Sequence, residues 1–133
     1  MVKNFPLLQL SLFFLAAILS VGADAQHGEY IVKHVSMCIE CHTPRNEKGE
    51  LLKDQLFRGA VIPIAGPEWG KTWMTRSVNI DGFNFRTDEE AVHFLETGLR
   101  PDGKRANLPM PQFRMNKKDA EDVVAYLKNR GDA

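Results

Sequence analysis

The sequence predicts an all-α domain in which short helices are joined by long loops. Residues 87–98 and 117–130 carry clear helix signals, and residues 27–42 have apolar positions at helical spacing without proline. Residues 43–85 are rich in proline and glycine and show no sustained periodicity, which is typical of loop. The alternation of strands and helices that marks a parallel-sheet domain does not occur in the chain.

Residues 1–25 have the layout of a secretory signal peptide. One positive charge precedes a long apolar run, which ends in Ala23-Asp24-Ala25. Small residues at positions minus three and minus one suit a signal peptidase, so we expect cleavage after Ala25, a periplasmic protein and one domain over residues 26–133. The alternative is an uncleaved membrane anchor, because the apolar run is only slightly shorter than the roughly 20 residues that span a bilayer.

The charge balance argues against nucleic acid as a partner. The chain has 17 basic and 17 acidic residues, and removal of the signal peptide takes away one of each. Nucleic-acid binding needs a basic face, which a net charge near zero does not favour. Docking to a protein partner would rest on local basic positions such as Arg45, Lys48, Lys104 and Arg105.

The helix predicted over residues 27–42 ends at a pair of cysteines, and the next predicted helix follows the long loop. Thr87 and Glu90 fit the Ser/Thr-x-x-Glu capping box, and Gly98 stands where glycine commonly ends a helix. Three residues of this helix are expected to face inward: Val92, Phe94 and Leu95.

The last predicted helix covers residues 117–130, with Asn116 as its N-cap. Its apolar residues recur at i, i+3, i+4 and i+7, and they are Ala120, Val123, Val124 and Leu127. Residues 100–113 before it are predicted to be loop, because they contain a Pro-Asp-Gly turn and two further prolines. Three short helices make a poor core alone, so we expect the loops to pack around a further group.

The motif Cys38-Ile39-Glu40-Cys41-His42 carries the chemistry of this sequence. Cys-x-x-Cys-His is the pattern of covalent c-type haem attachment. Two thiols three residues apart can each reach one vinyl group of the same porphyrin, and the imidazole of the next residue then lies under the iron. We therefore predict one covalently bound haem c, attached to Cys38 and Cys41 with His42 as an iron ligand.

Three other uses of the two cysteines are open. A thioredoxin-like redox pair also uses Cys-x-x-Cys, but within a strand and helix alternation. A zinc site needs two further ligands, and a structural disulfide between cysteines three apart would close only a tiny loop. None of these explains why histidine directly follows the second cysteine.

The second axial ligand of the iron is predicted to be Met110. A methionine thioether raises the potential of a haem relative to a second histidine. Met110 lies in Leu108-Pro109-Met110-Pro111, where two prolines restrict the loop and leave little entropy to lose. Met115, a histidine or an open sixth position are the alternatives.

Polar and aromatic residues of the long loop have candidate roles beside the porphyrin. Arg76 and Asn79 could hydrogen-bond a haem propionate. Trp69, Trp73 and Phe85 are expected in the core, part of which would be the porphyrin edge.

Several stretches together resemble the class I cytochrome c family, and most of all the cytochrome c modules of bacterial alcohol and gluconate dehydrogenase complexes. The resemblance covers residues 26–133. It is carried by the haem motif and by Gly28-Glu29-Tyr30, Cys41-His42-Thr43-Pro44-Arg45, Asn79-Ile80, Thr87-Asp88-Glu89-Glu90, Arg100-Pro101-Asp102-Gly103 and Pro109-Met110-Pro111.

The resemblance implies a class I cytochrome c fold wrapped around one haem. It implies that the first and last helices cross, with Tyr30 or its neighbours against Tyr126 and Leu127. It also implies that a proline carbonyl accepts a hydrogen bond from the second ring nitrogen of His42, with Pro44 and Pro63 as candidates.

The function implied by the motif and the resemblance is electron transfer without a substrate of its own. Such a carrier is not an enzyme, and its partners would be a periplasmic dehydrogenase as donor and an oxidase or reductase as acceptor. Two alternatives remain: a cytochrome subunit of a membrane-associated dehydrogenase complex, and a haem-based gas-binding or sensor protein with a labile sixth ligand.

Overall fold

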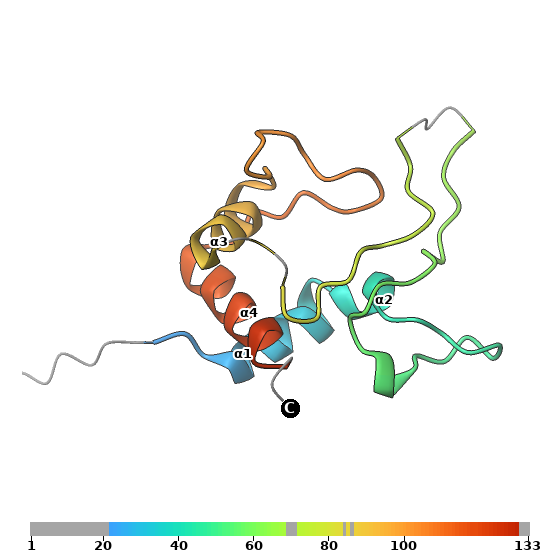
Figure 1. Ribbon diagram of the computed structural model, residues 1–133, viewed down its shortest axis with the longest axis horizontal. Helices are drawn as coiled ribbons and strands as arrows, with labels where there is room; N and C mark the ends of the chain where they lie inside the picture. The colour runs from blue at the N-terminus through green and yellow to red at the C-terminus, as the bar shows by residue number, and fades with distance from the viewer. Residues whose placement is uncertain (1–21, 69–71, 84, 86, 131–133) are drawn as a thin grey trace, which may run out of the picture.

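The computed structural model describes residues 22–68, 72–83, 85 and 87–130. Within them the chain is mostly helical, has no sheet and shows β pairing only as isolated bridges. The α-helices are α1 (Ala25–Tyr30), α2 (Cys38–His42), α3 (Asp88–Thr97) and α4 (Lys117–Asn129), and two further helical turns are the π-helical η1 (Ile31–Val35) and the 3-10 turn η2 (Lys53–Gln55). Figure 1 shows α1, α3 and α4 gathered together, while α2 lies to one side among the long loops.

The helix predicted over residues 27–42 is interrupted, so this prediction is wrong in its extent. The Asp24 side chain accepts the N–H groups of Gln26 and His27, and α1 begins there. After the wide π-helical turn η1, Met37 adopts the left-handed conformation with φ 53°. The chain changes direction at Met37, and the cysteine motif forms a separate helix, α2.

The first and last helices cross at Gly28. A Cβ atom on Gly28 would lie 2.0 Å from the Asp122 carbonyl oxygen and 3.0 Å from Tyr126 Cβ. The two backbones can approach this closely because glycine has no side chain. The crossing of the first and last helices is present, but a neighbour of Tyr30 makes this contact, and Tyr30 itself is 56% exposed.

Gly28→Ala should destabilise the fold by about 3 kcal/mol, at the upper end of overpacking effects, because backbone atoms must move. A thermal melt followed by circular dichroism should show the loss as a melting temperature lower by roughly 10 °C or more. Gln26→Ala, at an exposed position of the same helix, is the control and should melt like wild type. An unchanged melting temperature in Gly28→Ala would contradict this account of the crossing.

The predicted signals of α3 and α4 are confirmed. The Thr87 hydroxyl accepts the Glu90 N–H, and Gly98 ends α3 in the left-handed conformation with φ 70°. Asn116 caps α4 by accepting the Asp119 N–H at 2.8 Å. The residues predicted to face inward are all buried: Val92, Phe94, Leu95, Ala120, Val123, Val124 and Leu127.

A buried carboxylate, which the sequence analysis did not single out, joins α4 to the start of α1. The side chain of Asp122 is 0% exposed and accepts hydrogen bonds from the Asp24 N–H, His27 Nδ1 and Lys118 Nζ. Burial alone would raise the pKa of Asp122, but the hydrogen bonds from Lys118, Asp24 and His27 outweigh it and lower the pKa. The ionised carboxylate therefore stabilises the helix crossing. Cleavage after Ala25 would remove the contribution of Asp24.

Asp122→Asn should cost about 1–3 kcal/mol at neutral pH. Because folding lowers the pKa of Asp122, its stabilisation is present above the unfolded pKa and is lost as pH falls through the folded pKa. The difference in unfolding free energy between the two proteins should therefore shrink below about pH 4. Urea unfolding at a series of pH values measures it, with the more exposed Asp119→Asn as control. A difference that is the same at every pH would contradict the assignment.

The segment over residues 43–85 is irregular, as predicted, and is held by hydrogen bonds to α2 and its flank. The Phe57 N–H donates to the Thr43 hydroxyl at 3.0 Å, and both side chains are buried. The Gly59 N–H donates to the His42 carbonyl at 2.8 Å. These bonds fold the loop back onto the end of the cysteine motif.

In the part of the chain that the structure describes, no helix has the length and apolar character needed to cross a membrane. Most of the predicted signal peptide lies outside the described residues, which begin at Gly22.

Candidate functional site

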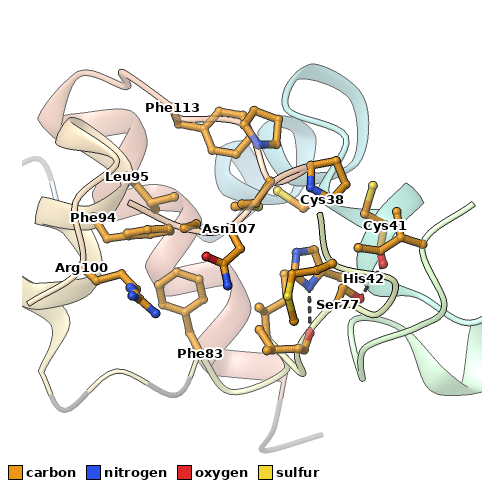
Figure 2. A pocket seen from close by; sticks show the side chains of 18 of the residues that line it. Cys38, Cys41, His42, Ser77, Phe83, Phe94, Leu95, Arg100, Asn107 and Phe113 are labelled. Carbon is orange, nitrogen blue, oxygen red and sulfur yellow. Dashed lines mark hydrogen bonds between the residues drawn. The ribbon is translucent and has the colours of Figure 1, made fainter. Parts of the chain in front are cut away.

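A largely apolar cavity of about 280 Å³ lies between α2 on one side and α3 and α4 on the other. Figure 2 shows Cys38, Cys41 and His42 on one wall, with Phe94 and Leu95 of α3 across from them. Loop residues complete the wall, among them Phe83, Phe113 and Met110. Its volume is of the order of those that hold small molecules and cofactors.

Both cysteines of the motif line this cavity as free thiols. Burial raises the pKa of the Cys38 thiol, and a hydrogen bond to Ser36 only partly opposes this effect. A redox-active cysteine works as a thiolate and has a lowered pKa. The environment of Cys38 therefore argues against a thioredoxin-like pair.

His42 is buried and oriented by a backbone carbonyl. Its Nδ1 donates a hydrogen bond to the Val78 carbonyl oxygen at 2.8 Å, so this nitrogen carries the proton. Burial lowers the pKa of His42, although the bond to Val78 works in the opposite direction. The ring is thus neutral, and its Nε2 has a lone pair for a metal ion.

The carbonyl that orients His42 belongs to Val78, so the expectation of a proline carbonyl is wrong. The segment around Val78 is attached to α2 through Ser77, whose hydroxyl donates to the Cys41 carbonyl at 2.6 Å. The Ser77 N–H also donates to the Ala60 carbonyl at 2.8 Å. These bonds place Val78, rather than Pro44 or Pro63, against the ring.

Met110 lines the same cavity as the cysteine motif. Met74 lines it too, and the Met74 N–H donates to the Leu108 carbonyl at 2.7 Å, which ties this segment to the Met110 loop. Met37 and Met115 are not among the described residues of the lining. Met115 instead packs against the core at the start of α4, with its N–H on the Leu95 carbonyl.

Of the loop residues that were expected beside a porphyrin, some line the cavity and others lie outside it. Arg76 lines the cavity, whereas the Asn79 side chain accepts the Asp81 N–H outside it. Phe85 lines the cavity, and Trp73 lies partly exposed with its Nε1 on the Ile64 carbonyl. Trp69 lies outside the described residues.

Two polar lining residues, Arg100 and Asn107, were not predicted as site residues. In the sequence, Arg100 belongs to a Pro-Asp-Gly turn and to one of the stretches that carry the resemblance, without a role of its own, and nothing marked Asn107. Figure 2 shows both side chains reaching into the cavity, Arg100 next to Phe83.

A grouping of side chains suited to a metal ion occurs elsewhere in the described part of the chain, at His27, Asp119 and Asp122. The Lys118 ammonium and the Asp24 N–H already occupy the Asp122 carboxylate there. The cysteine motif does not belong to this group. A zinc centre that includes Cys38 and Cys41 therefore has no supporting geometry among the described residues.

Comparison with protein-family models found no match, and comparison with curated proteins found none either. Function is therefore inferred from the residues of this chain and from their geometry.

Proposed function

We propose that this chain is a periplasmic electron carrier of the class I cytochrome c type. One haem would be bound covalently to Cys38 and Cys41, with His42 and Met110 as axial ligands of its iron. The observation that carries the proposal is the convergence of these four side chains on one apolar cavity, although they come from a short helix and a distant loop.

The chemistry of the donors fits a haem. Each thiol would add across one vinyl group, with the sulfur bonding to the carbon next to the ring and the hydrogen completing a methyl group. His42 is held neutral with Nδ1 on the Val78 carbonyl, which is the arrangement that orients a ligating imidazole and strengthens it as a donor. Met110 would offer its thioether from a loop stiffened by Pro109 and Pro111.

The surrounding residues support electron transfer rather than substrate turnover. When bound, a haem supplies an iron that takes up and gives back one electron. Buried apolar side chains such as Phe83, Phe94 and Leu95 line the cavity and offer water no hydrogen-bond partner. With two protein ligands in place, no coordination position is left for a substrate, and electrons would pass through the porphyrin edge to a docked dehydrogenase, oxidase or reductase.

A redox titration tests this function. Protein made in a host with haem-attachment machinery should take up and release one electron per chain reversibly, and its reduced form should bind no carbon monoxide at neutral pH. Ready binding of carbon monoxide by wild type would contradict the carrier and favour a gas-binding or sensor protein. A chain that takes up no electron would exclude both.

A further inference from the structure

The guanidinium of Arg100 has a buried Nε–H group without a hydrogen-bond partner. Three buried side-chain polar atoms in the described part of the chain have no hydrogen-bond partner: Asp81 Oδ1, Arg130 Nε and Arg100 Nε. The first two lie 3.6 Å apart and form an ion pair. Arg100 Nε has no such neighbour and belongs to a residue of the cavity wall.

The ion pair between Arg100 Nη2 and Asp102 does not explain why the Nε–H group of Arg100 is buried. Nη2 lies 3.3 Å from the Asp102 carboxylate, and both side chains are largely exposed there. An exposed ion pair of this kind contributes little to stability. A buried guanidinium N–H without a partner is unfavourable, so its partner is expected to come from the occupant of the cavity.

The charges around the cavity favour an anionic occupant. The titratable or charged side chains that line it, among the described residues, are Cys38, Cys41, His42, Arg76 and Arg100. This lining contains two arginines and no carboxylate. A guanidinium with a free N–H in an apolar wall is well suited to bind a carboxylate through charge-assisted hydrogen bonds.

A haem carries its two carboxylate side chains on the edge of the ring opposite the vinyl groups. Figure 2 shows Arg100 across the cavity from Cys38 and Cys41, which would bind the vinyl side. We propose that Arg100 binds a haem propionate at this end of the cavity, an inference that rests on the proposed function. The Asn107 side chain reaches into the same cavity and can supply a second donor.

The pH dependence of the reduction potential tests the role of Arg100. A guanidinium keeps ionised the propionate that it binds, so between about pH 5 and 8 the wild-type potential should depend on pH less than that of a variant without this cation. In Arg100→Gln the potential should be lower, because a cation that favours ferrous iron is gone. It should also rise as pH falls through this range, because the propionate now takes up a proton. Arg100→Lys keeps the charge and should restore most of the wild-type profile.

Two matched variants separate this role from its rivals. Asp102→Asn removes the exposed partner of Arg100 and should keep the wild-type pH profile. Lys104→Gln removes an exposed cation of the same turn, outside the cavity lining, and should keep that profile as well. A wild-type profile in Arg100→Gln would overturn the proposal, and an altered profile in Arg76→Gln beside it would assign the propionate to Arg76 instead.

The wild-type protein provides a second test if Arg100→Gln yields no folded haem protein. A pH titration of wild type followed by proton NMR, in which both haem propionates take up a proton between about pH 5 and 8, would overturn the role of Arg100. The covalent haem is first verified by the mass of the denatured wild-type protein. Its absence would count against the proposed function itself and so is distinguished from a failure of the Arg100 assignment.

Discussion

Replacing both Cys38 and Cys41 with alanine should leave a chain that is largely unfolded. Without covalent attachment the cavity of about 280 Å³ would be left without a permanent occupant. Large-to-small changes in a core cost about 2–5 kcal/mol for a single side chain, because packing contacts are lost. A haem fills far more space than one side chain, so its loss should remove most of the roughly 5–15 kcal/mol that stabilises a small domain. Helical content measured by circular dichroism should fall, and protease should digest the chain rapidly.

The single variants Cys38→Ala and Cys41→Ala are the controls for this experiment. Each keeps one thiol for attachment, so each should retain haem and more helical structure than the double variant. Native-like helical content with cooperative melting in the double variant would show that the polypeptide builds its own core. The account of a fold organised around a bound group would then be wrong.

Met110→Ala should remove the sixth ligand of the iron and open that coordination position to other molecules. Oxidised wild type should show a weak far-red absorption band from sulfur-to-iron charge transfer, and the variant should lose it. Reduced variant should bind carbon monoxide, which wild type should not. The potential should also fall, because a thioether favours ferrous iron and water does not.

Two other methionines serve as controls for Met110. Met115 packs against the core outside the cavity lining, so Met115→Ala should keep the band and lose some stability, about 1–2 kcal/mol for a partly buried side chain. Met74 lines the cavity but is 45% exposed, and Met74→Ala should also keep the band. Loss of the band in either control, with its persistence in Met110→Ala, would move the ligand to that methionine.

The sequence predicted best those elements whose signals are local. The capping residues Thr87 and Asn116 and the glycine at position 98 lie at the ends of α3 and α4, and each interacts within a few residues. The break before α2 has no such signal. It depends on a wide turn and on Met37 in a left-handed conformation that methionine seldom adopts.

The site residues that belong to a local sequence motif were predictable. Those whose contacts join distant parts of the chain were not. Cys38, Cys41 and His42 form a spaced motif, and Met110 is bracketed by prolines. The partner of His42 follows from hydrogen bonds that hold Ser77 and Val78 against α2, which no local pattern reveals.

Arg100 is a second residue that local patterns could not assign. Its proposed role depends on the loop that reaches the far end of the cavity, and only the folded chain shows which loop that is.

The measurement that tests the central claim most directly is the visible spectrum and mass of the purified protein after denaturation. Protein should be made in a host that attaches haem, then unfolded in acid and separated from free cofactor. The account predicts one haem that remains with each chain, lost only when Cys38 and Cys41 are both replaced. A colourless chain with the mass of the polypeptide alone would contradict it.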